Sequence, residues 1–408
     1  MRDAATHKPK FTKLAKVADP QSPIVYGIVQ PGPDLPDGVA FVQSRDVGGK
    51  ISLGALNRTS PEIANQYRRS RIHPGDILFS LRGNIGQSSL VPPELEGANI
   101  ARGVARIRVA EENDPEYIRY VLQGSALQKL IARNANGSTF REISIDELRK
   151  LPIPDVPLPE QRKIAEILRT WDEALEKLTT LHAAKERRFV AITQRLLAPS
   201  RAIGRHIPAS NWKLTSFGEV FDERKDRNTD LEADDAVTVG KYAIRKQSEH
   251  FSRSVASKDL SNYWVISPGD FVYDPMSAYY GALGRYTGRG DGIVSPAYRV
   301  IRLKSGINPN FMVHILRSHA IRFLLETRSS QGNKEGKRRL LSRDEFASVE
   351  FNLPDIELQK EIAGKISLAE KDLALTTAEI EALARQKRGL MQKLLAGEWS
   401  VKPEGAVD

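Results

Sequence analysis

The sequence contains no cysteine among its 408 residues. A disulfide, a thiolate nucleophile and a zinc–sulfur site are therefore excluded. Long hydrophobic runs are also absent: no stretch approaches the roughly 18 consecutive apolar residues of a membrane span, and the N-terminus lacks the apolar core of a secretion signal. We therefore expect a soluble, cytoplasmic protein that does not bind a membrane.

Patterns that carry catalysis are equally scarce. Gly332 to Lys337 is one residue too short for a phosphate-binding loop and lacks the Ser or Thr that should follow. Tyr273 to Met276 resembles the Asp-Pro-Pro-Tyr motif of amino-methyltransferases, but Met replaces the second proline, so a strand end and a turn are expected there. His314 and His319 are five apart and do not share a helical face as a metal pair would. The sequence predicts a non-catalytic chain without a cofactor or metal site.

One long segment of the chain occurs twice. Gln161 to Ala198 matches Gln359 to Ala396 without a gap. Both copies begin with Gln and a basic residue, continue to Ile-Ala, and end with Gln, a basic residue and Leu-Leu-Ala. Each copy follows an extended, proline-containing approach. A repeat of this length determines the architecture before any single residue is considered.

The spacing of apolar residues predicts that both copies are long helices. Hydrophobic positions recur at steps of three and four over more than four heptads, which is typical of a coiled coil. In the first copy the seam consists of Ile164, Leu168, Trp171, Leu175, Leu178, His182, Lys185, Phe189, Ile192 and Leu196. In the second it consists of Ile362, Ile366, Ala369, Leu373, Thr376, Ile380, Leu383, Lys387, Leu390 and Leu394. Pro199 and Gly397 stand just past the ends as stop signals.

A helix with one apolar stripe needs a partner, and the other copy is the nearest candidate. Full antiparallel overlap would place Phe189 opposite Ala369, so that a large ring meets a methyl group. It would also place His182 opposite Thr376. Trp171 would lie opposite Lys387, whose aliphatic stem can cover the indole. The alternative is that each helix packs only on its own globular domain.

Three shorter segments also recur in the same order, each with a later counterpart: His73–Phe79 with Ser267–Tyr273, Ile100–Arg108 with Val294–Arg302, and Ser144–Leu148 with Ser342–Phe346. The first pair begins with Pro-Gly and continues as an apolar, β-prone run, which predicts a turn followed by a strand. The order is therefore globular unit, long helix, globular unit, long helix.

This order predicts four parts: a globular domain over residues 1–157, a helix over 158–200, a second globular domain over 201–355 and a second helix over 356–400. Each globular part is large enough for its own core. Short runs of Val, Ile, Tyr and Phe between Gly and Pro indicate β-rich domains. The best helical stretches within them are Glu116 to Ala132 and Phe311 to Thr327.

The chain is basic, with 61 Lys and Arg against 51 Asp and Glu, giving a net charge of +10. The excess gathers in short clusters: Arg68–Arg71, Arg224–Arg227, Arg245–Lys246 and Lys334–Arg339. A single cluster of this kind is usually a solvated surface. Basic clusters with polar neighbours on two separate domains favour binding of duplex DNA at two half-sites.

These features together resemble the specificity subunit of type I restriction-modification systems over nearly the whole chain. The resemblance rests on the doubled Pro-Gly-Asp element (Pro74–Phe79 and Pro268–Tyr273) and on Arg82–Gly86 after the first. It rests also on Asn136–Arg141 before the proline approach, and on Leu-Pro-x-Glu-Gln at Leu158–Gln161. The second helix departs from the pattern because it lacks Pro-x-Glu-Gln.

The resemblance implies an α+β fold: two β-rich target recognition domains joined by two long antiparallel coiled-coil helices, with a pseudo-two-fold internal repeat. Each domain would read one half of a split double-stranded DNA sequence. The helices would set the spacing and dock two methyltransferase subunits, and restriction (motor-nuclease) subunits would join them. S-adenosylmethionine, ATP and Mg²⁺ would be bound by those partners, and no cofactor by this chain.

Transfer of the pattern to single residues predicts two sets. The expected DNA contacts are Arg82, Asn84, Arg141, Lys241, Arg285, Asn333 and Arg338. The expected residues of the coiled coil and partner interface are Leu168, Trp171, Leu175, Phe189, Ile366, Leu373, Ile380 and Leu390. Two other classes stay open: a standalone bipartite DNA-binding regulator, and a coiled-coil scaffold without specific DNA readout.

Overall fold

The computed structural model describes residues 10–135, 141–197, 212–241, 243–246, 259–331 and 339–401. The chain divides into two compact units. The first unit comprises Met1–Thr180 and Ala378–Asp408, and the second comprises Leu181–Thr377. Each unit therefore contains one globular domain and a part of both long helices, so the compact units cross the domain boundaries expected from the sequence.

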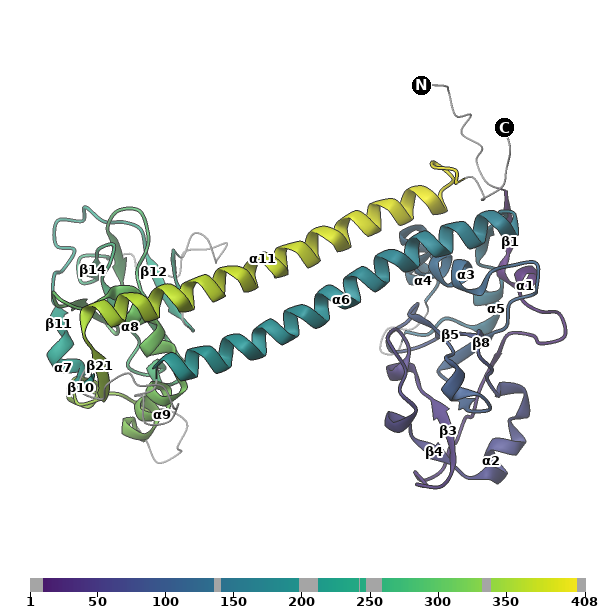
Figure 1. The fold of residues 1–408 in the computed structure, drawn as a ribbon, viewed down its shortest axis with the longest axis horizontal. Helices are drawn as coiled ribbons and strands as arrows, with labels where there is room; N and C mark the ends of the chain where they lie inside the picture. The colour runs from purple at the N-terminus through teal and green to yellow at the C-terminus, as the bar shows by residue number, and fades with distance from the viewer. Residues whose placement is uncertain are drawn as a thin grey trace. The chain divides into compact units, whose positions relative to one another are not determined.

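The two long helices, α6 (Leu158–Leu197) and α11 (Ile356–Leu395), have 40 residues each and begin at the expected positions (Figure 1). At the end of α11, the backbone N–H of Gly397 donates to the carbonyl oxygen of Leu394 at 3.2 Å. The stop signal expected there is confirmed. The stop at Pro199 lies outside the described residues. Among the described helices, none has the length and apolar character that crossing a membrane requires.

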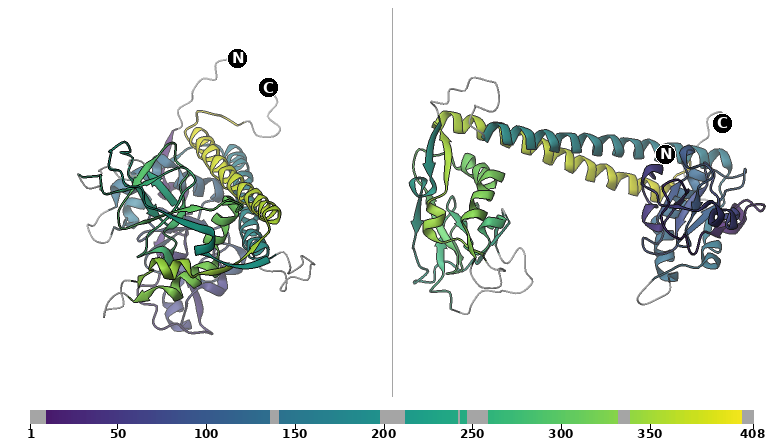
Figure 2. Two further views of the ribbon diagram at one scale, coloured as in Figure 1. Left: turned by 90° about the vertical axis from the view of Figure 1, so that its left-hand side faces the viewer. Right: turned by 90° about the horizontal axis from the view of Figure 1, so that it is seen from below.

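In each unit, α6 and α11 lie side by side and run in opposite directions (Figure 1, Figure 2). In the first unit the ammonium group of Lys387 forms an ion pair with Asp172. In the second unit Lys185 Nζ lies 2.8 Å from Asp372 Oδ1. Because the partner number falls as the α6 number rises, the helices are antiparallel, as predicted.

The middle of the seam is polar, and its register differs slightly from the prediction. His182 Nε2 lies 2.9 Å from the hydroxyl of Thr377, the residue after the expected partner. Thr376, which is buried, instead accepts a hydrogen bond from Lys185 Nζ at 2.9 Å. The long, flexible Lys185 reaches the buried position, which leaves the imidazole to the next residue of α11.

The globular domain of the first unit is a mixture of short strands and helices. Its strands are β1 (Phe11–Lys13), β2 (Val25–Tyr26), β3 (Val39–Val42), β4 (Arg58–Thr59), β5 (Ile77–Ser80), β6 (Ser88–Leu90), β7 (Asn99–Ile100), β8 (Val104–Ile107) and β9 (Pro152–Pro154). Its helices are α1 (Leu14–Val17), α2 (Pro61–Gln66), α3 (Pro115–Gln123), α4 (Ser125–Asn134) and α5 (Ile145–Arg149), with short 3-10 turns η1 (Ser44–Asp46), η2 (Leu53–Ala55), η3 (Arg68–Ser70) and η4 (Pro93–Leu95). The sheets have the strand orders β2-β8-β5-β6, β4-β3-β7 and β1-β9.

The globular domain of the second unit repeats this plan. Its strands are β10 (Trp212–Ser216), β11 (Phe221–Arg224), β12 (Val237–Gly240), β13 (Ala243–Lys246), β14 (Trp264–Ile266), β15 (Phe271–Tyr273), β16 (Leu283–Arg285), β17 (Gly292–Val294), β18 (Arg299–Leu303), β19 (Ser330–Gln331), β20 (Arg339–Leu340) and β21 (Glu350–Pro354). Its helices are α7 (Phe217–Val220), α8 (Pro309–Arg317), α9 (His319–Arg328) and α10 (Arg343–Ala347), with the 3-10 turn η8 (Ala278–Tyr280). The four-stranded order β11-β18-β15-β16 corresponds to β2-β8-β5-β6, and the pair β10-β21 corresponds to β1-β9.

The two helical stretches expected within the domains are each broken once. Gly124 separates α3 from α4, and Ser318 separates α8 from α9; both have extended backbone. The hydroxyl of Ser318 accepts from the N–H of Ile321, which is the usual N-cap of a new helix. Both stretches are therefore helical as expected, and each consists of two helices because a new helix starts inside the apolar period.

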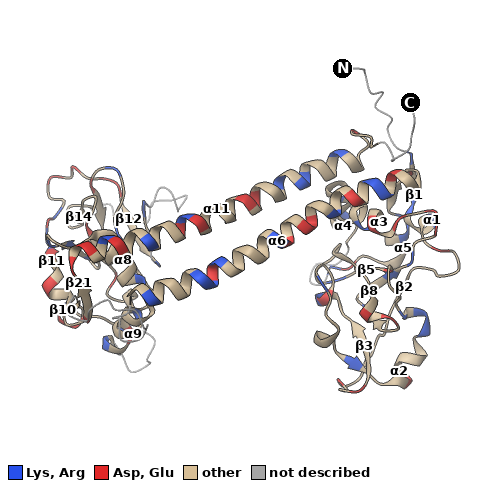
Figure 3. Ribbon diagram, in the orientation of Figure 1, with Lys and Arg blue, Asp and Glu red and all other residues tan. Residues whose placement is uncertain are grey.

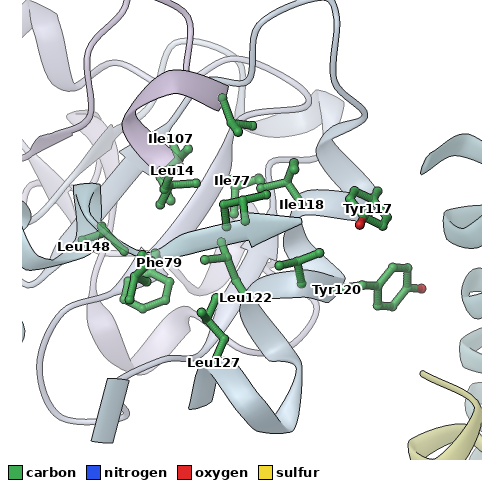
Figure 4. Packing of buried hydrophobic residues seen from close by; sticks show 14 of the residues in the cluster. Leu14, Ile77, Phe79, Ile107, Tyr117, Ile118, Tyr120, Leu122, Leu127 and Leu148 are labelled. Carbon is green, nitrogen blue, oxygen red and sulfur yellow. The ribbon is translucent and has the colours of Figure 1, made fainter. Parts of the chain in front are cut away.

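The core of the first unit joins the globular domain to both long helices. Buried residues of β5, β8 and α3 pack together, as Figure 4 shows for Ile77, Phe79 and Ile118. From the long helices, Leu168 and Leu394 enter the same cluster and are buried. The second unit repeats this arrangement with Ile362, Ala363 and Ile366 of α11, and Phe189 and Leu196 of α6 pack against it.

The doubled Pro-Gly-Asp element forms a turn held by a buried carboxylate. Gly75 has φ +86° and its counterpart Gly269 has φ +100°, a conformation that favours glycine. Asp76, 2% exposed, accepts from the N–H of His73 at 2.9 Å and from Arg108 Nε and Nη2 at 2.7 and 2.8 Å. This hydrogen bonding raises the pKa of Arg108. Through these bonds, the turn attaches the start of β5 to the end of β8.

In the second unit Asp270 has the same role, with two arginine partners. It accepts from Arg224 Nη1 at 2.6 Å, from Arg302 Nε at 3.0 Å and from the N–H of Ser267 at 2.9 Å. Asp270 is 2% exposed. Arg224, which belongs to one of the basic clusters seen in the sequence, is therefore used inside the domain.

The repeated Gln at the start of each long helix attaches the helix to its domain. Gln161, 2% exposed, accepts from the N–H of Asp114 at 2.8 Å and donates to the carbonyl of Val156 at 2.7 Å. Gln359 accepts from the N–H of Asn308 at 2.8 Å and donates to Pro354 at 2.8 Å. Asp114 and Asn308 are the N-caps of α3 and α8. The shared Gln therefore joins two helix starts in each unit.

Candidate nucleic-acid interface

In the first unit, four arginines gather beyond the end of β5. The backbone at Arg82 pairs with Glu142, which places Arg141 on the neighbouring segment. The N–H of Leu81 donates to Gly103 at 2.9 Å, so the segment of Arg102 lies on the other side. Ser44 Oγ also donates to Gly103, which adds its neighbour Arg45. We call this group (Arg45, Arg82, Arg102 and Arg141) the arginine edge.

Gly103 allows these segments to approach closely. A Cβ at this position would lie 2.7 Å from Arg82 Nε and 2.4 Å from Ser44 Oγ, so only glycine leaves room for the Arg82 side chain. The guanidinium group of Arg82 is therefore carried across the backbone of Gly103. The sequence Arg102-Gly103 thus supplies both a cation and the space for its neighbour.

The arginine edge is exposed and poorly neutralised. All four arginines are exposed. Arg45 lies 3.7 Å from Asp46 and donates to Asn57, whereas no ion pair among the described residues involves Arg82, Arg102 or Arg141. Exposed guanidinium groups without carboxylate partners attract a polyanion, and they can hydrogen-bond phosphates or guanine.

Asn84, one of the expected DNA contacts, has a structural role in the same loop. Its Oδ1 accepts from Ser80 Oγ at 2.5 Å, and its Nδ2 donates to the carbonyl oxygen of Val47 at 2.7 Å. The carboxamide therefore holds the loop against the segment after η1. These contacts support the loop that presents Arg82, and a direct DNA contact of Asn84 stays a prediction.

The second unit builds the same position from different side chains. The N–H of Leu341 donates to Pro275 at 2.9 Å, just as the N–H of Ile143 donates to Leu81 at 3.0 Å in the first unit. Met276 therefore corresponds to Arg82, and Arg339 corresponds to Arg141. The Tyr273–Met276 segment is a strand end and a turn, as expected from the sequence.

Two cations lie on aromatic rings at this position. Lys241 Nζ lies 4.7 Å from the centre of the exposed Tyr280 ring, and the guanidinium carbon of Arg339 lies 5.6 Å from the Tyr279 ring. Arg339 also forms an ion pair with Glu326 at 3.2 Å, whereas no ion pair among the described residues involves Lys241. Lys241, an expected DNA contact, is thus placed beside the turn that corresponds to the arginine edge.

Arg285 lies elsewhere in the second unit. It pairs with Phe271, at the opposite end of β15 from the turn, and its Nη1 donates to Asn310 at 3.1 Å. There it lines a cleft of about 370 Å³ together with Arg245 and Arg317. The structure therefore does not bring Arg285 to the position of Lys241. The expected contacts Asn333 and Arg338 lie outside the described residues.

The residues expected at the helix interface are all buried or half-buried. Leu168 and Ile366 are buried in the domain cores. Half-buried positions on α6 and α11 account for the others: Trp171, Leu175, Phe189, Leu373, Ile380 and Leu390. Their role at a coiled-coil or partner interface stays a prediction.

Some residues of these edges were not expected from the sequence. Arg102 and Arg45 belong to the arginine edge because of hydrogen bonds that Leu81 and Ser44 donate to Gly103. Met276, Tyr279 and Tyr280 lie on or beside the corresponding turn of the second unit. A signal was present for Arg102, because Ile100–Arg108 is one of the repeated segments and Arg102 is replaced by proline in the second copy.

Comparison with known proteins shows similarity to one family. Residues 37–186 match the model of the type I restriction modification DNA specificity domain. The specificity subunit of the type I restriction enzyme EcoBI of Escherichia coli is 28% identical over 243 residues, which are 58% of this chain and 50% of that protein. The match therefore spans about half the length of this relative.

The fold matches solved structures over nearly the whole chain. A chain from a study of complex assembly and conformational transition in a type I restriction-modification system has a TM-score of 0.60 and 16% identity, covering 96% of this chain and 99% of that chain. The specificity subunit from M. genitalium has a TM-score of 0.56 and 16% identity, covering 96% and 98%. The resemblance to the specificity subunits of type I restriction-modification systems is confirmed: residues 37–186 match the model of their DNA specificity domain, and the fold is similar to that of the solved chains over 96% of this chain.

Proposed function

We propose that the chain is the DNA specificity subunit of a type I restriction-modification complex and reads a bipartite double-stranded target, one half with each globular domain. The observation that carries this proposal is the arginine edge, an exposed and poorly neutralised cluster at the end of a strand. The corresponding position in the second unit also carries an exposed cation, Lys241. DNA phosphates would fix the register and base edges would specify the sequence.

The long helices are not the DNA-binding surface in this proposal. Lys and Arg alternate with Asp and Glu along both α6 and α11 (Figure 3). Such mixed charge produces no strong field of one sign, and it suits contacts with proteins better than contacts with a polyanion. The helices would instead hold the two reading domains at a constant spacing and dock two methyltransferase subunits.

Exposed leucines support docking on the second-unit part of α11. Leu368 is 70% exposed and Leu375 is 55% exposed. They lie seven residues apart and therefore on the same face of the helix. Val190 and Leu181 of α6 are exposed as well. Apolar side chains on the outer faces of long helices are suited to a protein partner.

The chemistry of the complex would belong to the partner subunits. S-adenosylmethionine would bind to the methyltransferase, which would take its target base out of the duplex. ATP and Mg²⁺ would bind to restriction subunits. This chain would contribute binding and positioning without a cofactor of its own and without catalysis.

DNA binding is tested by the salt dependence of the assembled complex. Arg82→Ala, Arg102→Ala and Arg141→Ala in one variant should reduce the slope of log affinity against log salt by up to about 2.7, or about 0.9 for each phosphate that is no longer neutralised. Lys129→Ala, an exposed lysine on α4, serves as the control and should leave the slope unchanged. An unchanged slope in the triple variant would remove the arginine edge from the DNA interface.

Docking is tested by co-purification with the methyltransferase. Leu368→Asp with Leu375→Asp should prevent assembly while helix content stays constant, because both side chains are exposed. Leu214→Asp, which changes a 57% exposed leucine on β10, is the matched control. Leu373 and Leu390 are less suitable positions because they are half-buried in the seam, where a charge would disturb the helix pair itself.

Tight specific DNA binding by the chain alone would indicate a standalone regulator, and DNA binding without salt dependence would indicate a scaffold.

A further inference from the structure

Exposed apolar side chains surround the turn that follows β15 in the second unit. Tyr280 is 58% exposed and Met276 is 43% exposed on the turn itself, Phe323 of α9 is 57% exposed, and Leu340 of β20 is 46% exposed. Exposure of large apolar side chains to water is unfavourable, so four of them at neighbouring positions indicate a contact surface. We call these four residues the apolar edge.

Backbone and side-chain contacts bring the four residues to one place. Leu341, next to Leu340, donates its N–H to Pro275, next to Met276. Helix α9 packs against η8, which carries Tyr280. Arg339 connects the same segments, since it bonds to Glu326 of α9 and lies over the Tyr279 ring. The apolar edge therefore forms around a single turn.

Two basic side chains lie beside the apolar edge, which indicates that its ligand is negatively charged. Lys241 lies on the Tyr280 ring, and no carboxylate within the described ranges pairs with it. Arg339 is partly neutralised by Glu326. A small apolar surface beside a free cation fits DNA, whose phosphates bind the cation and whose major groove exposes one apolar group, the C5-methyl of thymine. A stable protein interface needs a larger area than four side chains supply.

The first and second units have different side chains at the same backbone position of this turn. At the same backbone position the first unit has Arg82, whose guanidinium can donate two hydrogen bonds to guanine O6 and N7. Met276 has no donor and cannot make this contact. Its thioether side chain can pack against a methyl group. The two units therefore present different base-reading chemistry on matching frames.

We propose that the apolar edge reads at least one A·T pair of the second unit's half-site through the thymine methyl group, with Tyr280 and Met276 as the contacting residues. This inference rests on the proposed function. Lys241 holds the Tyr280 ring from one side and reaches toward the phosphates, so the ring presents its other side to the groove. Specificity for thymine arises from the methyl contact, and affinity arises in part from Lys241.

The test uses the assembled complex and a duplex that contains its own methylation target, identified by mapping the methylated sites. Each thymine of both half-sites is replaced in turn by deoxyuridine, which lacks only the methyl group. At one or more positions of one half-site, the wild-type complex should lose about fourfold in affinity, the effect of withdrawing one methyl group from apolar contact. The Tyr280→Ala complex should bind the thymine and deoxyuridine duplexes equally at that position.

Two further variants separate ring contact from folding. Tyr280→Phe keeps the ring and should retain the preference for thymine. Met276→Ala should reduce it. Thermal unfolding of the second unit should be unchanged in Tyr280→Ala, because the side chain is mostly exposed.

The failures of the two proposals are distinguishable. A complex that shows no sequence-specific DNA binding at all contradicts the proposed function. Specific binding without any sensitivity to deoxyuridine, or with the same sensitivity in Tyr280→Ala as in the wild type, overturns the thymine contact alone. Failure of methyltransferase assembly in Tyr280→Ala with unchanged DNA preference would show that the apolar edge binds a protein, which also overturns it.

Discussion

Asp76 is the residue whose removal should damage the first unit most specifically. Its carboxylate is buried and bonds to two nitrogens of Arg108 and to the backbone of His73. Its charge also favours the charged form of Arg106, whose pKa is lowered mainly by burial. Asp76→Ala would therefore remove the hydrogen-bonded counter-charge of Arg108 and one of the negative charges near Arg106.

The magnitude follows from how much water can replace the missing carboxylate. Removing one partner of a buried ion pair costs about 3–5 kcal/mol. The Arg108 side chain is 30% exposed, so water can solvate part of it, and we expect about 3 kcal/mol from the lower end of this range. For a unit of this size, 1 kcal/mol corresponds to about 2–4 °C in Tm, so the first unit should lose about 6–12 °C.

Calorimetry of the complete chain measures this effect, since two compact units should give two transitions. Asp76→Ala should lower one transition, and Asp270→Ala, its counterpart in the second unit, should lower the other. Adding Arg108→Met to Asp76→Ala should recover part of the loss, because a buried charge without a partner is then absent. A shift below about 2 °C for Asp76→Ala, or an equal shift of both transitions, would refute the view that this carboxylate holds its own unit together.

Other predictions concern the contacts that attach the long helices. Gln161→Ala should destabilise the first unit, and Gln359→Ala the second, each by about 3 kcal/mol in urea unfolding, because two buried backbone groups lose their partner at about 1–3 kcal/mol each. A single variant that destabilised both units equally would contradict this. Tyr120→Phe should cost about 1.5–3 kcal/mol through loss of the 2.6 Å bond from its hydroxyl to Asp172, and a neutral effect would mean that water replaces the bond fully. Burial lowers the pKa of His314 below its ordinary 6.5, against the opposing charge of Glu370, so the unfolded chain takes up a proton first as the pH falls. The second unit should therefore lose stability as the pH falls below about 6.5, and thermal unfolding of His314→Gln between pH 7.5 and 5.5 should show less loss than the wild type.

The long helices could be predicted closely because their signal is periodic and long. A heptad seam over 40 residues averages out local exceptions, and each helix begins at the predicted residue. The shorter helices within the domains were predicted less well. Gly124 and Ser318 interrupt an otherwise apolar period, and nothing in that period shows whether a glycine or serine is tolerated or starts a new helix.

The candidate interface could be predicted only in part, because exposure and partners depend on the tertiary structure. Arg82 and Arg141 were expected from separate motifs, and the structure places them on neighbouring segments. Asn84 comes from the same motif as Arg82, yet its carboxamide is bonded inside the domain. Sequence patterns do not distinguish a polar side chain that supports a loop from one that the loop presents.

The internal repeat explains why the frame was easier to recognise than the interface. Residues that both copies share are used inward: Asp76 and Asp270 hold the turns, and Gln161 and Gln359 hold the helices. A buried polar group tolerates few replacements, because any change leaves its partners unsatisfied. Exposed positions have no such constraint. Arg82 in one copy therefore corresponds to Met276 in the other, although the same backbone hydrogen bond supports both. In a protein with two reading domains, the positions at which the copies differ while the surrounding contacts agree are the ones to test for sequence discrimination.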